Sequence, residues 1–365
     1  MDGLDAWFAE LKDPRPSGTR RRDLLDVMMI ALCAVLSGGR TAVDMAVFAE
    51  AKHDFLGKFL RLRKRSTEPR HLQSVVPPTG SRPVPRACFQ KFVARFGDTC
   101  SDVIAIDGKA LPRPSDPHRA GSALHMISAW SCEKRLVLAQ IAADHKSRES
   151  AAVLELLKFL SLRGTTVTTD ALNRRRDIVR QIVEKGGDYA LALKGNHRAQ
   201  HADVSLLLKD PRWERGQKHL TADGDHGRIE TRTSLVCTEV AGIQKRHRWP
   251  GLAAIGKVIR TRDTARTATT ETAYDLLSAA LSPERLGQVA RSHWGVENRL
   301  HWVLNAVMHE DRTRNRNDNS AYNLAILRHR AINLMQRDRS RMSLRSNSTS
   351  PLGRASSWPS CFRPF

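Results

Sequence analysis

Two strand-forming segments that each run into an aspartate constrain the fold of this chain more than any other feature. The apolar run Val103–Ile106 is followed by Asp107, and the β-branched run Thr165–Thr169 is followed by Asp170. Segments of this length and composition are typical of strands buried within a sheet. If the two strands are neighbours, their ends place both carboxylates side by side. A buried carboxylate is costly unless a positive charge meets it, so we expect a basic side chain or a metal ion there.

The segments around these two strands predict an α/β domain. Strands are expected at residues 103–107, 125–130, 136–141, 165–170 and 189–193, and helices at 149–162 and 174–185. The resulting order is three strands, a helix, a strand, a helix and a strand. A ribonuclease-H-like mixed sheet with flanking helices has this order, and we therefore predict that fold.

The N-terminal part of the chain has a different character. Residues 1–62 are expected to form a helical region with helices at 23–36 and 42–62. Its function is either DNA binding or a helical cap with solvated arginines. Residues 63–86 are rich in proline and arginine and lack apolar periodicity, so we expect a loop or a disordered segment there.

The catalytic domain is expected to span residues 87–345, followed by a disordered tail at 346–365. A β-rich insertion is predicted at about 216–282, with strands at 229–237, 253–262 and 273–277. Helices are predicted at 87–96, 282–308 and 321–335.

The formal net charge of +22 is the strongest global signal about partners. A basic excess of this size repels itself unless a polyanion neutralises it, which favours DNA or RNA over an anionic membrane surface. Aromatic residues make up only 5% of the chain, which disfavours a single-strand binder built on stacked bases. The expected phosphate contacts are the cluster Arg20, Arg21 and Arg22 and the arginine-rich stretch Arg312–Arg345.

Cysteine usage and hydropathy predict a cytoplasmic protein. The six cysteines are scattered, without a CxxC pair or a cysteine–histidine zinc spacing, as expected for reduced thiols. The apolar run Leu24–Leu36 is too short to cross a bilayer and lies too far inside the chain to be a signal peptide. We therefore expect no membrane association.

A divalent metal ion suits two adjacent carboxylates. Two such groups a few ångströms apart repel each other, which raises one pKa unless a cation lies between them. Magnesium binds one or two carboxylates and phosphate oxygens, and two ions about 4 Å apart can assist an in-line phosphoryl displacement. A third carboxylate normally holds the second ion. Glu297 is the best candidate, because its predicted helix also presents His293 and His301 one turn to either side.

The residue pattern alone leaves simpler roles open. An aspartate after a strand is often a turn former or a helix cap, and the two histidines can be structural. Glu310 and Asp311 form a rival acidic pair for the third ligand. Lys109 and Lys194 are either phosphate contacts or surface charges.

A series of short motifs in this chain resembles the H-repeat-associated family of bacterial insertion-sequence transposases. The resemblance covers about residues 5–62 and 87–340 and rests on IAIDGKAL, LHMISAW, LVLAQ, TTVTTDAL, EKGGDYALALKGN, HGRIETRT, WPGLAAIG, HWGVENRLHWVL and YNLAILRHRAINLM. This resemblance implies a ribonuclease-H-like fold, an Asp-Asp-Glu (DDE) triad that binds Mg²⁺, with Mn²⁺ as a substitute, and recognition of the terminal inverted repeats of an element.

Matching the motifs residue by residue gives each acid a role. The first aspartate of the triad is Asp107 of IDGK, the second is Asp170 of TTDAL, and the glutamate is Glu297 of HWGVEN, which favours Glu297 over Glu310. The implied reaction is cleavage at the inverted repeats and transfer of the 3′-hydroxyl ends to target DNA. The implied partner is double-stranded DNA, bound by a homodimer or a larger oligomer. The expected DNA contacts are Lys109, Lys194, Asn298, Arg20, Arg21, Arg22, Arg312 and Arg314, with His293 and His301 in support.

The chain also departs from the family pattern. Related transposases often carry Arg and Lys near the catalytic Glu, where this chain has His293 and Leu304, and the family usually reads HWVLD where this chain has Asn305. The tract 63–86 replaces a helical segment, and the pattern is lost again from Asn347. We hypothesise that both tracts arose from local frameshifts. The alternatives to an active transposase are therefore a decayed, non-catalytic DNA-binding copy and a ribonuclease-H-like nuclease without strand transfer.

Overall fold

A computed structural model describes most of the chain, and the account below concerns those residues. They are 23–58, 60, 62, 102–111, 124–143, 148–169, 175–214, 216–225, 228–264, 267–312 and 320–337. Several predictions from the sequence lie outside these ranges, namely those for Asp170, Arg20, Arg21, Arg22, Arg314, the helix at 87–96, the tract 63–86 and the tail 346–365.

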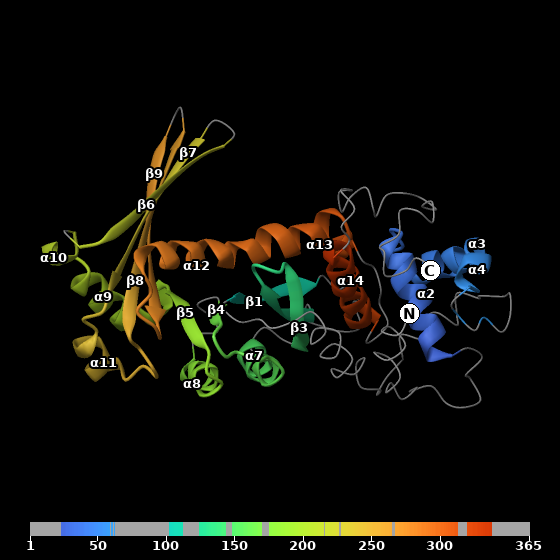
Figure 1. Cartoon of the computed structure of the whole chain (residues 1–365), viewed down its shortest axis with the longest axis horizontal. Coiled ribbons are helices and arrows are strands. Elements are labelled where there is room, and N and C mark those ends of the chain that lie inside the picture. Colours follow the sequence, from blue (N-terminus) through green and yellow to red (C-terminus); the bar gives the residue numbers. More distant parts are fainter. Residues whose placement is uncertain are drawn as a thin grey trace, which may run out of the picture.

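A nine-stranded mixed sheet forms the centre of the molecule, in the order β3-β2-β1-β4-β5-β9-β8-β7-β6 (Figure 1). Its strands are β1 Val103–Leu111, β2 Leu124–Ser131, β3 Leu136–Ala143, β4 Thr166–Thr169, β5 Asp188–Leu193, β6 Lys218–Asp225, β7 Arg228–Cys237, β8 Ala254–Thr264 and β9 Ala268–Leu277. Strands β1, β4 and β5 are parallel, and β2 and β3 are antiparallel to their neighbours. This arrangement confirms the predicted ribonuclease-H-like fold.

The predicted β-rich region continues this sheet. Strand β9 pairs antiparallel with β5, with Leu191 opposite Leu276, and β8, β7 and β6 follow by antiparallel pairing. Strands β7, β8 and β9 were expected from the sequence, whereas β6 was not. Strand β6 lies at the edge of the sheet, and its one large apolar residue, Leu220, is 64% exposed. An edge strand that buries so little apolar surface gives almost no hydrophobic alternation to read.

Helices cover both faces of the sheet. Helices α7 (Glu149–Lys158) and α8 (Arg176–Glu184) pack below it in Figure 1, α7 on β2 and β3 and α8 on β5. Helix α12 (Pro283–Gly295) crosses above it and contacts β1, β4, β6, β7 and β8. The side chain of Ser282 caps α12 by accepting from the N–H of Arg285. The shorter helices are η4 Gly195–His197, α9 Arg198–Leu207, α10 Pro211–Glu214 and α11 Ala241–His247.

The helix predicted at 282–308 is interrupted. After α12 the chain forms a π-helical segment, η5 (Val296–His301), and then α13 (Trp302–Ala306). A π-helical turn takes one more residue than an α-helical turn and is frequent at functional sites. Across this change of helix type, His293 and Glu297 still line one cavity with Asp107, and His301 lies 3.7 Å from Asp107.

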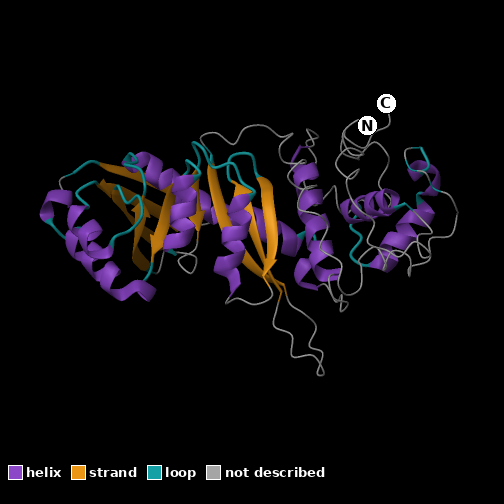
Figure 2. Cartoon of the chain, turned by 90° about the horizontal axis from the view of Figure 1, so that it is seen from below, coloured by secondary structure: helices purple, strands orange, loops and turns teal. Residues whose placement is uncertain are grey.

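The N-terminal helices lie beyond the sheet. Helix α2 (Leu24–Leu36) is capped by Asp23 and packs against α14 (Ser320–Arg337) and α3 (Ala42–Ala51), which α4 (His53–Leu56) follows. In both views α14 lies between these helices and the sheet (Figures 1 and 2). No helix in the described ranges combines the length and apolar character needed to cross a bilayer.

Helix α14 corrects one expectation about the arginine-rich stretch Arg312–Arg345. Arg328 and Arg330 are each only 2% exposed, so these two do not face phosphate. The reason is the position of α14, which packs against β3 on one side and α2 on the other. Charge counting along the sequence cannot detect such burial.

Candidate active site

Asp107 lies within β1, and the predicted end of this strand is wrong. Antiparallel pairing with β2 continues to Leu111, and Asp107 lies opposite Ser128. Parallel pairing with β4 covers only Val103 to Ile106, so Asp107 lies where its neighbour β4 ends. The carboxylate is 18% exposed and accepts from the N–H of Gly108 through Oδ1 at 2.9 Å.

The register between β1 and β4 brings the second predicted acid toward the first. Ile106 is the Cα partner of Thr169, the last residue of β4, and Asp170 follows Thr169 in the sequence. Thr168 and Thr169 line the same cavity as Asp107. Asp170 itself falls outside the described residues, and within them no group of three His, Cys, Asp or Glu side chains could hold a metal ion.

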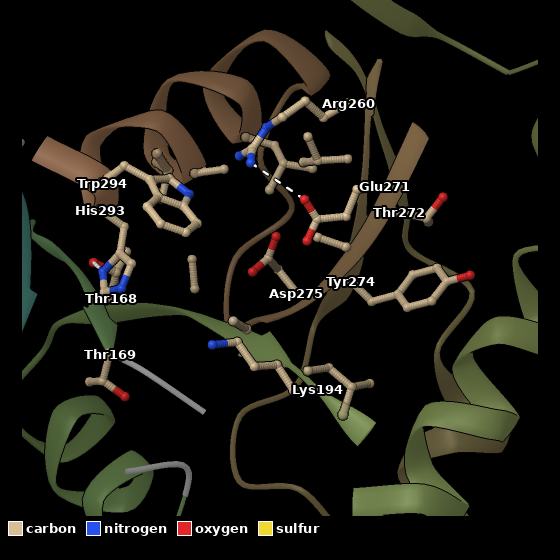
Figure 3. A pocket seen from close by; sticks show the side chains of 18 of the residues that line it. Thr168, Thr169, Lys194, Arg260, Glu271, Thr272, Tyr274, Asp275, His293 and Trp294 are labelled. Carbon is tan, nitrogen blue, oxygen red and sulfur yellow. Dashed lines mark hydrogen bonds and ion pairs between the residues drawn. The ribbon is translucent and has the colours of Figure 1, made fainter. Parts of the chain in front are cut away.

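Glu297 lines the same cavity as Asp107, although nearly two hundred residues separate them in the sequence. The cavity measures about 370 Å³ and lies between the β4–β5–β9–β8 part of the sheet and α12. Glu297 is exposed and is carried by the π-helical segment η5. His293 points to β4, where its Nδ1 lies 3.0 Å from Thr168 Oγ1 (Figure 3).

His301 contacts Asp107 as a neutral ring. Its Nδ1 lies 3.7 Å from Asp107 Oδ2. Burial, together with smaller effects of the nearby His329 and Lys109, lowers the pKa of His301 to about 4. At neutral pH the contact with Asp107 is therefore not an ion pair, and His301 adds no positive charge that would compete with a cation.

His329 lies behind the strand that pairs with Asp107. Its Nδ1 donates to the carbonyl oxygen of Ala325 at 2.7 Å, which leaves Nε2 to accept from Ser128 Oγ at 3.3 Å. Burial also lowers the pKa of His329. This places a second neutral histidine in the polar interior beneath the site.

Lys109 is held by the rival acidic pair. Its Nζ lies 2.8 Å from Glu310 Oε2 and 2.8 Å from Asp311 Oδ1, and its side chain is 11% exposed. These acids belong to the short 3₁₀ helix η6 (Glu310–Arg312), so the contact ties β1 to the chain after α13. A DNA contact by Lys109 stays a prediction, although its ammonium group is already paired. The other expected contacts within the described ranges, Lys194, Asn298 and Arg312, are exposed.

Two acids that were not predicted from the sequence lie in or next to this site. Asp275 on β9 points into the cavity together with Lys194 (Figure 3), and burial raises its pKa to about 6. Glu149 approaches β1 so closely that a Cβ on Gly108 would lie 2.5 Å from Glu149 Oε1. In the sequence Glu149 resembles any acid in the first turn of a helix, and Asp275 is one polar residue in an alternating strand. Only the packing of distant segments distinguishes them.

Comparison with known families identifies the chain. A family described as "Transposase DDE domain" matches residues 98–334, a range that contains Asp107, Asp170 and Glu297. A second family, described as "DDE_Tnp_1-associated", matches residues 6–77. The chain belongs to the DDE transposase family. This family acts on DNA, and its catalytic domains generally use divalent metal ions.

Curated relatives of this DDE transposase-family chain support the predicted H-repeat-associated branch. The "H repeat-associated putative transposase YhhI" of Escherichia coli K12 is 33% identical over 340 residues, which cover 90% of this chain and 89% of the relative. An "Uncharacterized protein in dhlA 3'region" of Xanthobacter autotrophicus is 38% identical over 267 residues, covering 70% and 88%. The "Putative transposase YncI" of Escherichia coli O157:H7 is 28% identical over 347 residues, covering 92% and 88%.

Proposed function

We propose that this chain cuts DNA at the terminal inverted repeats of its element and transfers the freed ends to target DNA. In the first step, water attacks the phosphorus at the element end, and the P–O3′ bond breaks to leave a 3′-hydroxyl. In the second step, that hydroxyl attacks a target phosphodiester and displaces its 3′ oxygen. Asp107, Asp170 and Glu297 are the proposed catalytic acids.

The register between β1 and β4 is the observation that carries this proposal. It aligns the strand positions that lead into Asp107 and Asp170, and Glu297 lines the same cavity as Asp107. Three carboxylates from two adjacent strands and a facing helix are suitable for magnesium, which prefers oxygen ligands. Bound Mg²⁺ or Mn²⁺ would activate the attacking oxygen and stabilise the leaving one.

The other residues of the site have supporting roles in this proposal. His301 and the N–H of Gly108 fix the rotamer of the Asp107 carboxylate without adding charge. His293 holds the C-terminal end of α12 against β4 through Thr168, which keeps Glu297, in the segment that follows, at the cavity. Lys194 and Asn298 are proposed to contact DNA, and DNA binding would place the protein at the nucleoid. The proposed acting form is a homodimer or a larger assembly.

A cleavage and joining assay tests the proposal. The substrate is a duplex that carries the inverted repeats flanking the gene, with Mg²⁺ or Mn²⁺ present. We expect Asp107→Ala, Asp170→Ala and Glu297→Ala each to abolish both steps while DNA binding is retained. Glu284→Gln is a matched control, because Glu284 is an exposed acid on the helix that leads to Glu297.

Three outcomes would contradict parts of the proposal. Strand transfer by Asp170→Ala would remove that residue from the site. Nicks without joined products would indicate a nuclease. Binding without cleavage by the unchanged protein would indicate a decayed copy that only occupies DNA.

A further inference from the structure

A groove lined by arginines lies on the other flank of α12 from the acidic cavity. Its six arginines come from two strands and one helical stretch, namely Arg228, Arg232, Arg260, Arg262, Arg291 and Arg299. None of them was predicted as a DNA contact from the sequence. We refer to this hollow of about 610 Å³ as the arginine groove.

The sheet aligns these side chains on one face. Residues 228, 230 and 232 alternate along β7 and therefore point the same way. In the ladder between β7 and β8, Arg232 lies directly opposite Arg260, and Glu230 lies opposite Arg262. Like charges directly opposite each other in a sheet are destabilising, so this arrangement carries a cost that the fold alone does not require.

Three carboxylates offset only part of this charge. The buried Glu230 lies 2.7 Å from Arg232, 3.2 Å from Arg260 and 3.8 Å from Arg262. Asp223 on β6 lies 2.7 Å from Arg232 and 2.6 Å from Arg291. Glu271 reaches Arg260 at 3.6 Å from the side of the acidic cavity. Six guanidinium groups facing three carboxylates leave an excess of positive charge in a concave surface.

The arginine groove adjoins the acidic cavity. Both hollows are lined by Val258, Arg260, Ala290 and Trp294, and Asn298 of the groove follows Glu297 of the cavity in the chain. The guanidinium carbon of Arg260 lies 5.4 Å from the ring centroid of Trp294, which is 47% exposed (Figure 3). A polyanion lying in the groove would therefore continue toward the three proposed catalytic acids.

We propose that the arginine groove binds the sugar-phosphate backbone of duplex DNA next to the bond that is cut. This inference rests on the proposed function and adds the surface that holds the substrate. Glu230 and Asp223 hold Arg232, Arg260 and Arg291 in place. The exposed guanidinium groups of Arg228, Arg262 and Arg299 can reach phosphates in the groove. Arginine suits this role because its planar fork binds phosphate through two N–H groups.

The test compares two variants of the full chain that lose the same charge. The groove variant carries Arg228→Gln, Arg262→Gln, Arg291→Gln and Arg299→Gln. The control variant carries Arg163→Gln, Arg180→Gln, Arg246→Gln and Arg248→Gln, which replace four exposed arginines away from the groove. Arg246 pairs with Asp203 as Arg291 pairs with Asp223, which makes the controls matched in that respect as well.

The readout is the affinity for a labelled DNA duplex, measured over a range of salt concentrations in EDTA so that no cleavage occurs. Each lost phosphate contact reduces the slope of log K against log salt by about 0.9, so the groove variant should lose about 3 to 4 in slope and on the order of 100-fold or more in affinity. The control variant should lose less than about 1 in slope.

Equal losses in both variants, or no loss in the groove variant, would overturn the proposal. So would a larger loss for duplex RNA than for duplex DNA. Should the groove variant fail to fold, Arg228→Gln with Arg299→Gln replaces it, since neither residue forms an ion pair within the described part of the chain. For this double variant, the slope of log K against log salt should fall by about 2. Because binding is measured without metal, the result does not depend on whether the acids cleave DNA.

Discussion

Lys109 shows how one residue can join two distant parts of the chain. Replacing it by methionine would leave Glu310, which is 2% exposed, without the ammonium group that contacts it. Removing one partner of a buried pair is strongly destabilising, so we expect Lys109→Met to lower the free energy of unfolding by about 3 kcal/mol. Urea unfolding followed by circular dichroism measures this loss.

The control for Lys109→Met is the double variant with Glu310→Gln. Neutralising Glu310 removes its need for a counter-charge, so the double variant should recover part of the lost stability. If the loss in the double variant equals the sum of the losses in Lys109→Met alone and Glu310→Gln alone, the two side chains are not coupled.

Asp275 predicts a specific dependence of stability on pH. Its folded pKa of about 6 is raised by burial above the ordinary value of 3.8. The folded state therefore binds more protons than the unfolded state between these values, and stability falls as pH rises through this window. Asp275→Asn removes this penalty. The two pKa values differ by about two units, and each unit is worth about 1.4 kcal/mol, so the free energy of unfolding of the variant should be higher than that of the original protein by up to about 3 kcal/mol at pH 7.

Urea unfolding of both proteins at pH 4, 5, 6 and 7 measures this difference. The gain of the Asp275→Asn variant should grow from pH 4 to pH 6 and then level off, because Asp275 is ionised in both states at higher pH. A gain that stays constant across this range would exclude burial of the carboxylate as its cause.

At the scale of elements, the approach of α12 to β8 depends on a missing side chain. A Cβ on Gly256 would lie 2.7 and 2.8 Å from the two terminal methyl carbons of Leu286, which is fully buried on α12. Gly256→Ala should therefore overpack this interface and lower the free energy of unfolding by about 1–3 kcal/mol. Thermal unfolding measures the effect.

Gly224→Ala is the matched control, because Gly224 also lies in a strand but a Cβ added there would meet nothing within 4 Å. It should change the stability little. Adding Leu286→Ala to Gly256→Ala should cost less than Leu286→Ala alone, since the new methyl group then fills part of the space. If the loss of stability in the double variant equals the sum of the two single-variant losses, the two residues do not compete for space.

At the scale of the whole molecule, the sheet is continuous through the β5–β9 pairing. The region predicted as an insertion contributes four strands to it, and β8 and β9 bury Ile255, Leu276 and Leu277 completely. We therefore expect the amides in the β5–β9 ladder to exchange with solvent as slowly as those in the β1–β4 ladder. Hydrogen exchange with mass spectrometry measures both sets.

Faster exchange across all of β6 to β9, with β1 to β5 unaffected, would contradict this expectation. It would identify the four strands as a separately unfolding unit. Fast exchange at the outer edge alone, in β6, is expected, because an edge strand is paired on one side only.

Local pattern was sufficient for much of the fold. The alternation and composition of residues 103–193 predicted β1 to β5, α7 and α8 in the right order, because each strand or helix follows from its own residues. The same reading could not detect the π-helical segment η5 or the buried Arg328 and Arg330. Both depend on what packs against a helix, and neither leaves a periodic signal in the sequence.

For the candidate site, the sequence by itself determined which acids to consider, since Asp107 and Asp170 follow strand-forming runs and Glu297 lies in a family motif. Tertiary structure decided that Asp107, Glu297 and Asp275 line one cavity, that Glu149 lies against Gly108, and that Glu310 pairs with Lys109. It also assembled the arginine groove from β7, β8 and α12. The physical reason is that residue type and local periodicity are written in neighbouring positions, whereas charge pairing and burial depend on segments up to two hundred residues apart.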